Sequence, residues 1–218
     1  MVKVAVISDF DGTISKEDFF YYVIDNHLSP EDIEPWNDYK AGKINHVEGL
    51  RRIFSKISMS EKDLKDFILK LPIEENFLET LKFCNDNNID FYVLSAGADY
   101  YIKIIFNELK VSNNLTLISN PSIYAKKGGI SILPSDTDNI YYSHDYGVSK
   151  KLAVEDIKQK YDKIIFAGDG IPDFEASKLA DVVFARGALL QLCNSNNVKS
   201  QTFNTYGDIL EFLKNDKA

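Results

Sequence analysis

Residues 2–13 read VKVAVISDFDGT, an apolar and β-branched run that stops at acidic residues. Its first seven residues predict a short buried strand, because β-branched side chains favour strands. Asp9 and Asp11 follow, and Gly12 and Thr13 then break the pattern. Open α/β sheets bind ligands beyond the carboxyl ends of their strands. This stretch therefore predicts both a sheet and a site at one edge of it.

The segment from residue 17 to residue 71 reads as helix throughout. Pro30 stands at a first helical position, and Ser60 with Asp63 three residues on resembles a capping box. Pro72 closes the segment. We expect helices over residues 18–27, 29–42, 46–57 and 60–71.

Strands and helices alternate beyond residue 73. Strands are expected over residues 90–94, 115–119, 123–125, 129–133, 163–167 and 182–185. Helices are expected over residues 76–87, 150–161, 174–179, 189–194 and 206–213, with another ending at residue 109. This alternation is typical of a parallel sheet covered by helices on both faces. The predicted fold class is therefore α/β, a Rossmann-like parallel-sheet core of residues 1–14 and 73–218 with a small all-helical cap, residues 15–72, inserted after the first strand.

The composition limits the classes of partner. The chain has 218 residues, 44% of them hydrophobic and 12% aromatic, which is enough for a packed core. Its net charge is -8 and its pI is near 5.0, which argues against nucleic acid, since a nucleic-acid-binding face is basic. A small phosphorylated metabolite stays compatible with this charge, because a divalent metal and one or two lysines can supply local positive charge.

The sequence shows no targeting or membrane segment. The chain runs from Met1 into an apolar strand without a signal-peptide cleavage site, and no apolar run approaches the length of a membrane span. Cys84 and Cys193 lie in apolar helical patterns and are expected to be buried free thiols. We expect a cytoplasmic protein that is a monomer or a homodimer and has no membrane partner.

Polar residues suited to catalysis follow three of the predicted strands. Asp9 and Asp11 follow the first strand, residues 95–97 (Ser-Ala-Gly) follow the strand that ends at Leu94, and residues 168–173 (GDGIPD) follow the strand that ends at residue 167. Lys150 opens the helix before that last strand. In a parallel sheet all four groups meet at the same edge.

The chemical types of these residues indicate phosphoryl transfer. Asp9, Asp11 and Asp169 would crowd negative charge together unless a cation neutralises it, and hard carboxylate oxygens favour Mg²⁺. A carboxylate that attacks phosphorus forms an aspartyl phosphate. A second acid two residues on can protonate the leaving alcohol and later activate water. Ser95 and Lys150 suit phosphate oxygens.

The order of these motifs resembles the four signature motifs of the haloacid dehalogenase superfamily. They are DFDGT at residues 9–13, the strand that leads into Ser95, the helix-opening Lys150, and GDGIPD at residues 168–173. The resemblance spans nearly the whole chain. It implies that Asp9 is the nucleophile and a Mg²⁺ ligand, and that Asp11 is the acid/base whose backbone carbonyl also reaches the metal. It makes Asp169 a further metal ligand and Asp173 an outer-shell acid that organises metal and water.

The same resemblance implies the phosphate-binding groups, which are Thr13, Ser95, Ala96, Gly97 and Lys150. Lys151 is the alternative to Lys150. Lys150 is preferred because Val154 and Ile157 then fall at the apolar helix positions of the family.

The helical insert resembles the cap of the phosphoserine-phosphatase branch, and a lid of this kind excludes water and selects the leaving group. Within the branch, the chain is similar to the methionine-salvage phosphatases in three stretches, which are residues 48–50 leading to Phe54, residues 91–97, and residues 184–193. Phosphoserine phosphatases use a cap acid and a cap arginine, which fall here on Asp18 and Ile53. Isoleucine cannot pair with a carboxylate, so phosphoserine fits poorly. The chain also departs from the methionine-salvage group, which has cysteines where residues 145–149 stand here.

We therefore predict a Mg²⁺-dependent phosphatase for a small phosphomonoester, with a methionine-salvage type of sugar phosphate as one candidate. Asp11 argues against dehalogenation, which does not use that second aspartate. The alternatives are a phosphoserine phosphatase, a phosphotransferase or mutase on the same fold, and a catalytically silent phosphate sensor.

Overall fold

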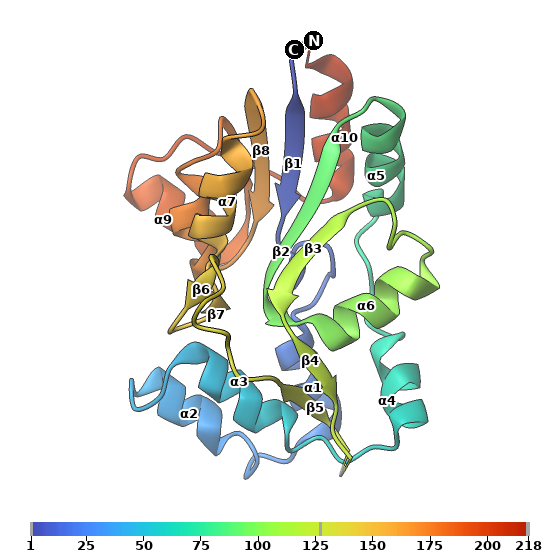
Figure 1. Ribbon diagram of the computed structural model, residues 1–218, viewed down its shortest axis with the longest axis vertical. Coiled ribbons are helices and arrows are strands. Elements are labelled where there is room, and N and C mark those ends of the chain that lie inside the picture. The colour runs from blue at the N-terminus through green and yellow to red at the C-terminus, as the bar shows by residue number, and fades with distance from the viewer. Residues whose placement is uncertain (1, 127, 217–218) are drawn as a thin grey trace.

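The computed structural model describes residues 2–126 and 128–216, and a parallel sheet forms its upper half in Figure 1. Over the described residues the sheet has six strands, in the order β10-β9-β8-β1-β2-β3. Every neighbouring pair is parallel. The strands are β1 (Val4–Ser8), β2 (Asp90–Ala98), β3 (Thr116–Asn120), β8 (Lys163–Gly168), β9 (Val182–Ala185) and β10 (Gln201–Thr202).

Helices cover both faces of this sheet (Figure 1), as strands with apolar residues on both sides require. Val4 and Val6 of β1 face one hydrophobic cluster, whereas Ala5 and Ile7 face another, because successive side chains of a strand point to opposite faces. The first face packs against α5 (Phe77–Asp86), α6 (Asp99–Glu108) and α10 (Tyr206–Asn215). The second packs against α7 (Lys150–Lys158), α8 (Phe174–Ser177) and α9 (Gly187–Ser195).

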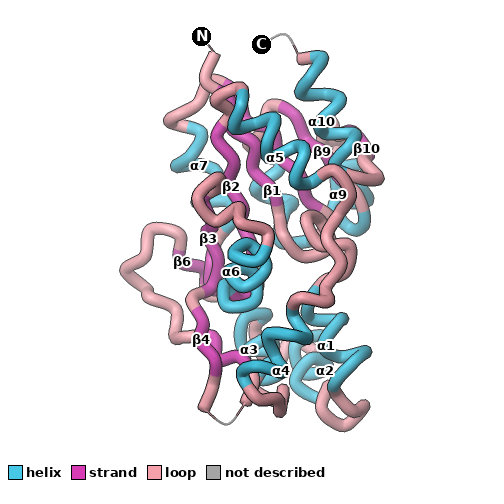
Figure 2. Tube along the Cα trace, turned by 90° about the vertical axis from the view of Figure 1, so that its right-hand side faces the viewer, coloured by secondary structure: helices cyan, strands magenta, loops and turns pink. Residues whose placement is uncertain are grey.

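A second layer lies beyond the carboxyl ends of the strands, at the bottom of Figures 1 and 2. It holds α1 (Phe19–His27), α2 (Glu34–Lys40), α3 (His46–Phe54) and α4 (Glu61–Ile68). Side chains of Asp18, Asn45 and Ser60 cap α1, α3 and α4 by accepting backbone N–H groups. An antiparallel hairpin of β4 (Ser122–Tyr124) and β5 (Ile130–Ile132) joins this layer, and Arg51 of α3 donates to the Ile132 carbonyl at 3.2 Å.

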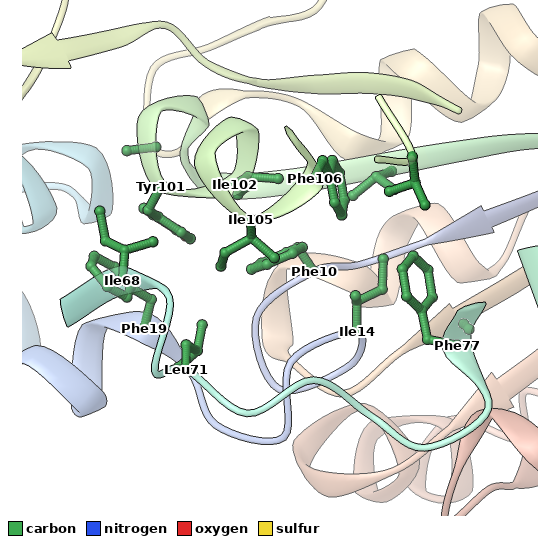
Figure 3. Close-up of a cluster of buried hydrophobic side chains, with 14 of the residues drawn as sticks. Phe10, Ile14, Phe19, Ile68, Leu71, Phe77, Tyr101, Ile102, Ile105 and Phe106 are labelled. Carbon is green, nitrogen blue, oxygen red and sulfur yellow. The ribbon is translucent and has the colours of Figure 1, made fainter. Parts of the chain in front are cut away.

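Apolar side chains join the two layers, as Figure 3 shows. Phe10 follows β1, Phe19 begins α1 and Tyr101 belongs to α6, and all three are buried. The rings of Phe19 and Tyr101 stack with centroids 4.1 Å apart. The helical layer is therefore fixed to the end of the central strand by packing as well as by the chain.

The two connections between the layers run side by side. Ser15 and Ile73 form an antiparallel bridge. The Lys16 N–H donates to the Pro72 carbonyl at 2.8 Å, and the Glu74 N–H donates to the Ile14 carbonyl, also at 2.8 Å.

The predicted α/β class is confirmed, with differences in detail. The helix expected from residue 29 begins only at Glu34, because the Ser29 hydroxyl binds the Asp32 carboxylate at 2.8 Å in a turn. Strand β2 runs on to Ala98, so residues 95–97 lie in the strand rather than beyond it. The short strands β6 (Tyr142–Ser143), β7 (Gly147–Val148) and β10 were not predicted.

Cys84 and Cys193 are buried free thiols, as expected. Along the described chain, every helix is too short or too polar to cross a membrane.

Candidate active site

The strand order creates the site. The chain proceeds outward from β1 to β2 and β3, and then crosses back so that β8 lies on the other side of β1. Such a reversal leaves a crevice at the carboxyl ends of the strands. A cavity of about 350 Å³ lies there and is lined by residues from both layers, including Asp9, Asp11, Asp18, Ser95 and Asp169.

Lys150 forms two buried ion pairs at this cavity. Its Nζ lies 2.6 Å from Asp9 Oδ1 and 2.7 Å from Asp173 Oδ1, and its side chain is 2% exposed. Ser149 caps α7 by accepting the Leu152 N–H at 3.2 Å, which places Lys150 at the first helical position. Lys151, in contrast, is 49% exposed and faces Glu155 at 3.6 Å. The geometry thus places Lys150, not its neighbour, beside the strand-end aspartates.

Three carboxylates gather beside this lysine. One oxygen each of Asp9, Asp169 and Asp173 lies within 4.8 Å of the others. Burial raises the pKa of Asp9, the negative charge of Asp173 raises it further, and Lys150 opposes both. Burial, followed by Asp173, raises the pKa of Asp169 to about 6. A further positive charge would relieve this repulsion, and hard oxygen donors suit a divalent cation.

Asp173 contacts Lys150 and the backbone of the loop that carries Asp169. Besides its contact with Lys150, it accepts the N–H groups of Gly170 at 2.9 Å and Asp169 at 3.2 Å through Oδ2. Its oxygens are thus engaged by the protein, which fits a position behind the metal ligands. Asp169 is oriented in turn by the Thr13 hydroxyl, which donates to its Oδ1 at 2.9 Å.

The Asp11 carboxylate turns toward α6 and α1 rather than toward this cluster. Its Oδ2 accepts the Tyr101 hydroxyl at 2.5 Å and the Ser95 hydroxyl at 3.2 Å, and its Oδ1 accepts the Phe19 N–H at 3.1 Å. Burial raises the pKa of Asp11, and the Tyr101 hydroxyl is the largest opposing influence. Gly97 is required beside this group, because a Cβ there would lie 2.0 Å from the Tyr101 hydroxyl.

Not every expected phosphate-binding residue faces the cavity. Ser95, Ala96 and Gly97 line it. Thr13 is fully buried and lies outside the lining, because its hydroxyl is engaged with Asp169. Gly12 has a φ of +68°, and a Cβ there would come within 2.5 Å of Asp169 Oδ2. The tight turn after the first strand thus brings that loop against β8.

Arg186 fastens the same loop. Its guanidinium donates to the Gly12 carbonyl at 2.9 and 2.6 Å and to the Glu74 carboxylate at 2.7 Å. Glu74 follows the return connection from the helical layer and is buried. Arg186 therefore joins the loop after β1 to the base of that layer.

Aromatic rings form part of the cavity lining, and we call them the aromatic wall. Its members are Phe20, Trp36, Tyr39 and His46 of the helical layer, with Tyr146 from the turn between β6 and β7. Ring centroids lie 4.0 Å apart for Phe20 and Trp36, 4.6 Å for Trp36 and Tyr39, and 5.2 Å for His46 and Tyr146. Burial and the nearby charge of Lys150 lower the pKa of His46 to about 4, so this ring is neutral near pH 7.

The two cap residues expected to read the leaving group differ in position. Asp18 lines the cavity, and its carboxylate accepts the Phe20 N–H at 2.7 Å. Burial, with a contribution from Asp11, raises the pKa of Asp18 to about 8. Ile53 is fully buried in the hydrophobic core and does not line the cavity, because its face of α3 packs inward. A role for Ile53 in substrate specificity stays a prediction.

Sequence reasoning missed Tyr101, Tyr146 and Arg186 as parts of the site. Tyr101 and Tyr146 lie in aromatic-rich surroundings that read as core. Arg186 follows β9 directly, and its place just after a strand was the one available signal.

Comparison with known proteins shows the family of this chain. A family model described as Putative Phosphatase matches residues 4–202. A 2-hydroxy-3-keto-5-methylthiopentenyl-1-phosphate phosphatase from Bacillus mycoides (strain KBAB4) is 30% identical to this chain. The match covers 98% of this chain and 97% of the relative.

Solved structures share the fold. A phospho-aspartyl intermediate analogue of phosphoserine phosphatase has a TM-score of 0.70 at 19% identity and covers all of both chains. A HAD family hydrolase from Salmonella enterica subsp. enterica serovar Typhi has a TM-score of 0.74 at 13% identity and covers 100% of this chain and 73% of that one. At these identities the likeness speaks for the fold alone.

Proposed function

The chain belongs to the family described as Putative Phosphatase, and from that membership we propose that it hydrolyses a small phosphomonoester through an aspartyl phosphate on Asp9. It is a phosphoric monoester hydrolase of the haloacid dehalogenase superfamily. The observation that carries the proposal is the buried contact of 2.6 Å between Asp9 Oδ1 and Lys150, with Asp11 two residues further along the chain.

The residues suit a two-step reaction. An Asp9 oxygen attacks phosphorus, the ester P–O bond breaks with its electron pair on the leaving oxygen, and Asp11 gives that oxygen a proton. Water then attacks the phosphorus bound to Asp9, and its proton passes to Asp11. The bond between Asp9 and phosphorus breaks, which releases inorganic phosphate and restores both carboxyl groups.

Lys150 and Ser95 support these steps. Lys150 holds Asp9 in place and lies where a phosphoryl oxygen would share its positive charge. Ser95 already accepts the Gly97 N–H at 2.9 Å while it donates to Asp11, so it is fixed at the cavity wall.

The donor set fits a divalent cation, and we propose Mg²⁺. Asp9, Asp169 and the backbone carbonyl of Asp11 would hold it, with Asp173 behind them. Bound there, the ion would supply positive charge to the transferring phosphoryl group. The carboxylate excess around a single lysine supports this assignment.

We propose that residues 15–72 act as a cap on a core of residues 1–14 and 73–218. The side-by-side connections at Ser15 and Ile73 support this division. Hairpin β4–β5 belongs to the core in sequence but packs on α3, so it would move with the cap.

For the substrate, we propose the kind of molecule that names the relatives, a methylthio-substituted keto sugar phosphate. The aromatic wall supports this choice, because polarizable sulfur packs well against rings. Among the described residues that line the cavity, Lys150 is the only cation, and it already contacts Asp9 and Asp173. A phosphoserine carboxylate would thus lie in this cavity without a partner.

The test is release of inorganic phosphate from a panel of small phosphomonoesters, including phosphoserine, with Mg²⁺ and with EDTA. We expect metal-dependent release that is fastest for keto sugar phosphates. Transfer to a sugar acceptor without phosphate release would favour a mutase instead. No turnover of any substrate would favour a silent phosphate sensor.

A further inference from the structure

Two polar atoms of the aromatic wall have no partner. Trp36 Nε1 and His46 Nδ1 are buried, and neither has a hydrogen-bond partner within the described chain. Both residues line the cavity that holds Asp9 and Lys150. Their rings lie edge to face with centroids 5.8 Å apart, so the two nitrogens belong to one part of the wall.

An unpaired buried polar group of this kind destabilises a protein, because it has lost its contact with water and gained no partner. Folded proteins retain few of them, and each calls for a reason such as a ligand or an ordered water. Here the two occur in the same cavity wall, on residues from α2 and α3. The wall is also tightly placed, because Gly49 of α3 lies against Trp36 and Tyr39, where a Cβ would contact Tyr39 at 3.3 Å.

The chemistry of the two nitrogens defines what can satisfy them. Tryptophan Nε1–H only donates, so it requires an acceptor oxygen. His46 is neutral near pH 7 because its pKa is lowered, and a neutral imidazole nitrogen donates or accepts but does not attract a carboxylate. The group they fit is therefore an uncharged hydroxyl or carbonyl oxygen, held among aromatic rings.

We propose that Trp36 and His46 form a specificity subsite that binds uncharged oxygen functions of the leaving group. The subsite selects polyoxygenated, uncharged phosphomonoesters over simple alkyl phosphates. The inference rests on the proposed function, since it assigns a part of that same cavity to the leaving group. A site built to hydrogen-bond a substrate oxygen discriminates strongly against an analogue that lacks it.

The test compares two substrates of the same length, pentyl phosphate and a pentyl phosphate that carries hydroxyl groups on its second and third carbons. For each enzyme, kcat/KM is measured on both, and their ratio is the readout. Trp36→Phe keeps the ring but removes the N–H, and His46→Phe removes both ring nitrogens. Tyr22→Phe is the matched control, because Tyr22 lies on α1, packs on Phe67 and does not line the cavity.

The wild type is expected to prefer the hydroxylated substrate. Each wall variant should lower that preference about tenfold, which corresponds to roughly 1.4 kcal/mol, and Tyr22→Phe should leave it within about twofold of the wild type. An equal loss on both substrates would mean a structural role and would overturn the proposal. Unchanged kcat/KM on both substrates would mean that water satisfies the nitrogens, and would overturn it too.

The ratio is insensitive to partial misfolding, because both substrates meet the same preparation. The wild-type rates separate the two claims. Absence of any phosphate release by the wild type would defeat the proposed function itself, whereas turnover without a change in ratio would defeat only the subsite.

Discussion

Lys150 and Lys151 are neighbours in the chain but lie in opposite surroundings, and this contrast isolates the contribution of one buried charge. Lys150 is 2% exposed between two aspartates, and Lys151 is 49% exposed on the outer face of α7. The carboxylates of Asp173 and Asp9 outweigh burial and raise the pKa of Lys150, so it remains charged.

We predict that Lys150→Met lowers kcat/KM for phosphate release about a hundredfold or more, because a preorganised charge beside the reacting group is lost. Lys151→Met should change it by less than about twofold, since exposed ion pairs contribute little. Steady-state kinetics on the two purified variants measures both effects. A comparable loss in Lys151→Met would reject the assignment.

His46 makes stability depend on pH. Its pKa is about 4 in the folded protein because of burial and of Lys150, against 6.5 ordinarily, so the unfolded state binds the proton more readily between these values. The contribution of His46 to the free energy of unfolding should therefore fall as pH decreases from 6.5 to about 4, by about 3 kcal/mol in total.

Asp18 has the opposite effect on the free energy of unfolding. Its pKa is raised to about 8 in the folded protein, so the folded state binds the proton more readily and acidification stabilises it. The contribution of His46 is thus read as the difference between wild type and His46→Phe in urea unfolding across this pH range. If the two proteins lose stability in parallel on acidification, His46 is not buried as described.

At the scale of elements, the start of α7 positions Lys150, the lysine proposed to contact the phosphoryl group. Ser149 caps α7, and Ser60 caps α4 in the same way by accepting the Asp63 N–H at 3.2 Å. We predict that Ser149→Ala and Ser60→Ala each lower the free energy of unfolding by about 1 kcal/mol. Only Ser149→Ala should also reduce kcat/KM, because α7 alone presents Lys150. Chemical denaturation and kinetics on both variants check this, and an equal loss of activity in Ser60→Ala would refute it.

Arg186 joins the loop after β1 to the return connection of the helical layer. Its pair with Glu74 is 20% and 7% exposed, so removal of the arginine leaves a buried carboxylate unpaired. Arg186→Gln should lower the free energy of unfolding by about 3 kcal/mol. In a double-mutant cycle with Glu74→Gln, the coupling energy should exceed about 1 kcal/mol.

The exposed pair of Lys214 and Glu79 provides the control for that cycle. Its coupling energy should stay below about 1 kcal/mol. Equal couplings for the two pairs would show that Arg186 contributes no more than a surface charge.

The sequence predicted elements well where periodicity and capping agreed. The strand before Asp9 and the capped helix after Ser60 are examples. The sequence-based prediction was wrong or incomplete where tertiary contacts determine the secondary structure. Strands β6, β7 and β10 have two residues each, too few for a period, and the turn at Ser29 depends on a side-chain contact that periodicity does not report.

At the scale of the whole molecule, topology gathers residues that are far apart in the chain. Asp9, Lys150 and Asp173 meet because β1 lies next to β8 and α7 precedes β8. Motif order at strand ends predicted this convergence. The sequence did not reveal that Ile53 faces the core or that Tyr101 reaches Asp11, since helix rotation and side-chain direction follow from packing between layers.

The groups proposed for the chemistry and those proposed to select the substrate come from different parts of the molecule. Asp9 and Asp11 follow β1 and Lys150 begins α7, whereas the aromatic wall, apart from Tyr146, comes from the helical layer. Strand β1 begins, and α10 ends, at the far end of the sheet from that wall (Figure 1).

The central claim is that Asp9 carries the phosphoryl group, and trapping that intermediate tests it most directly. The enzyme is mixed with a turned-over phosphomonoester and Mg²⁺, quenched in acid within the first turnover, and digested for mass spectrometry. We predict phosphate on the peptide that contains Asp9, no label with Asp9→Asn, and loss of catalytic phosphate release in that variant. Phosphate on another residue, or appreciable turnover by Asp9→Asn, would contradict the account.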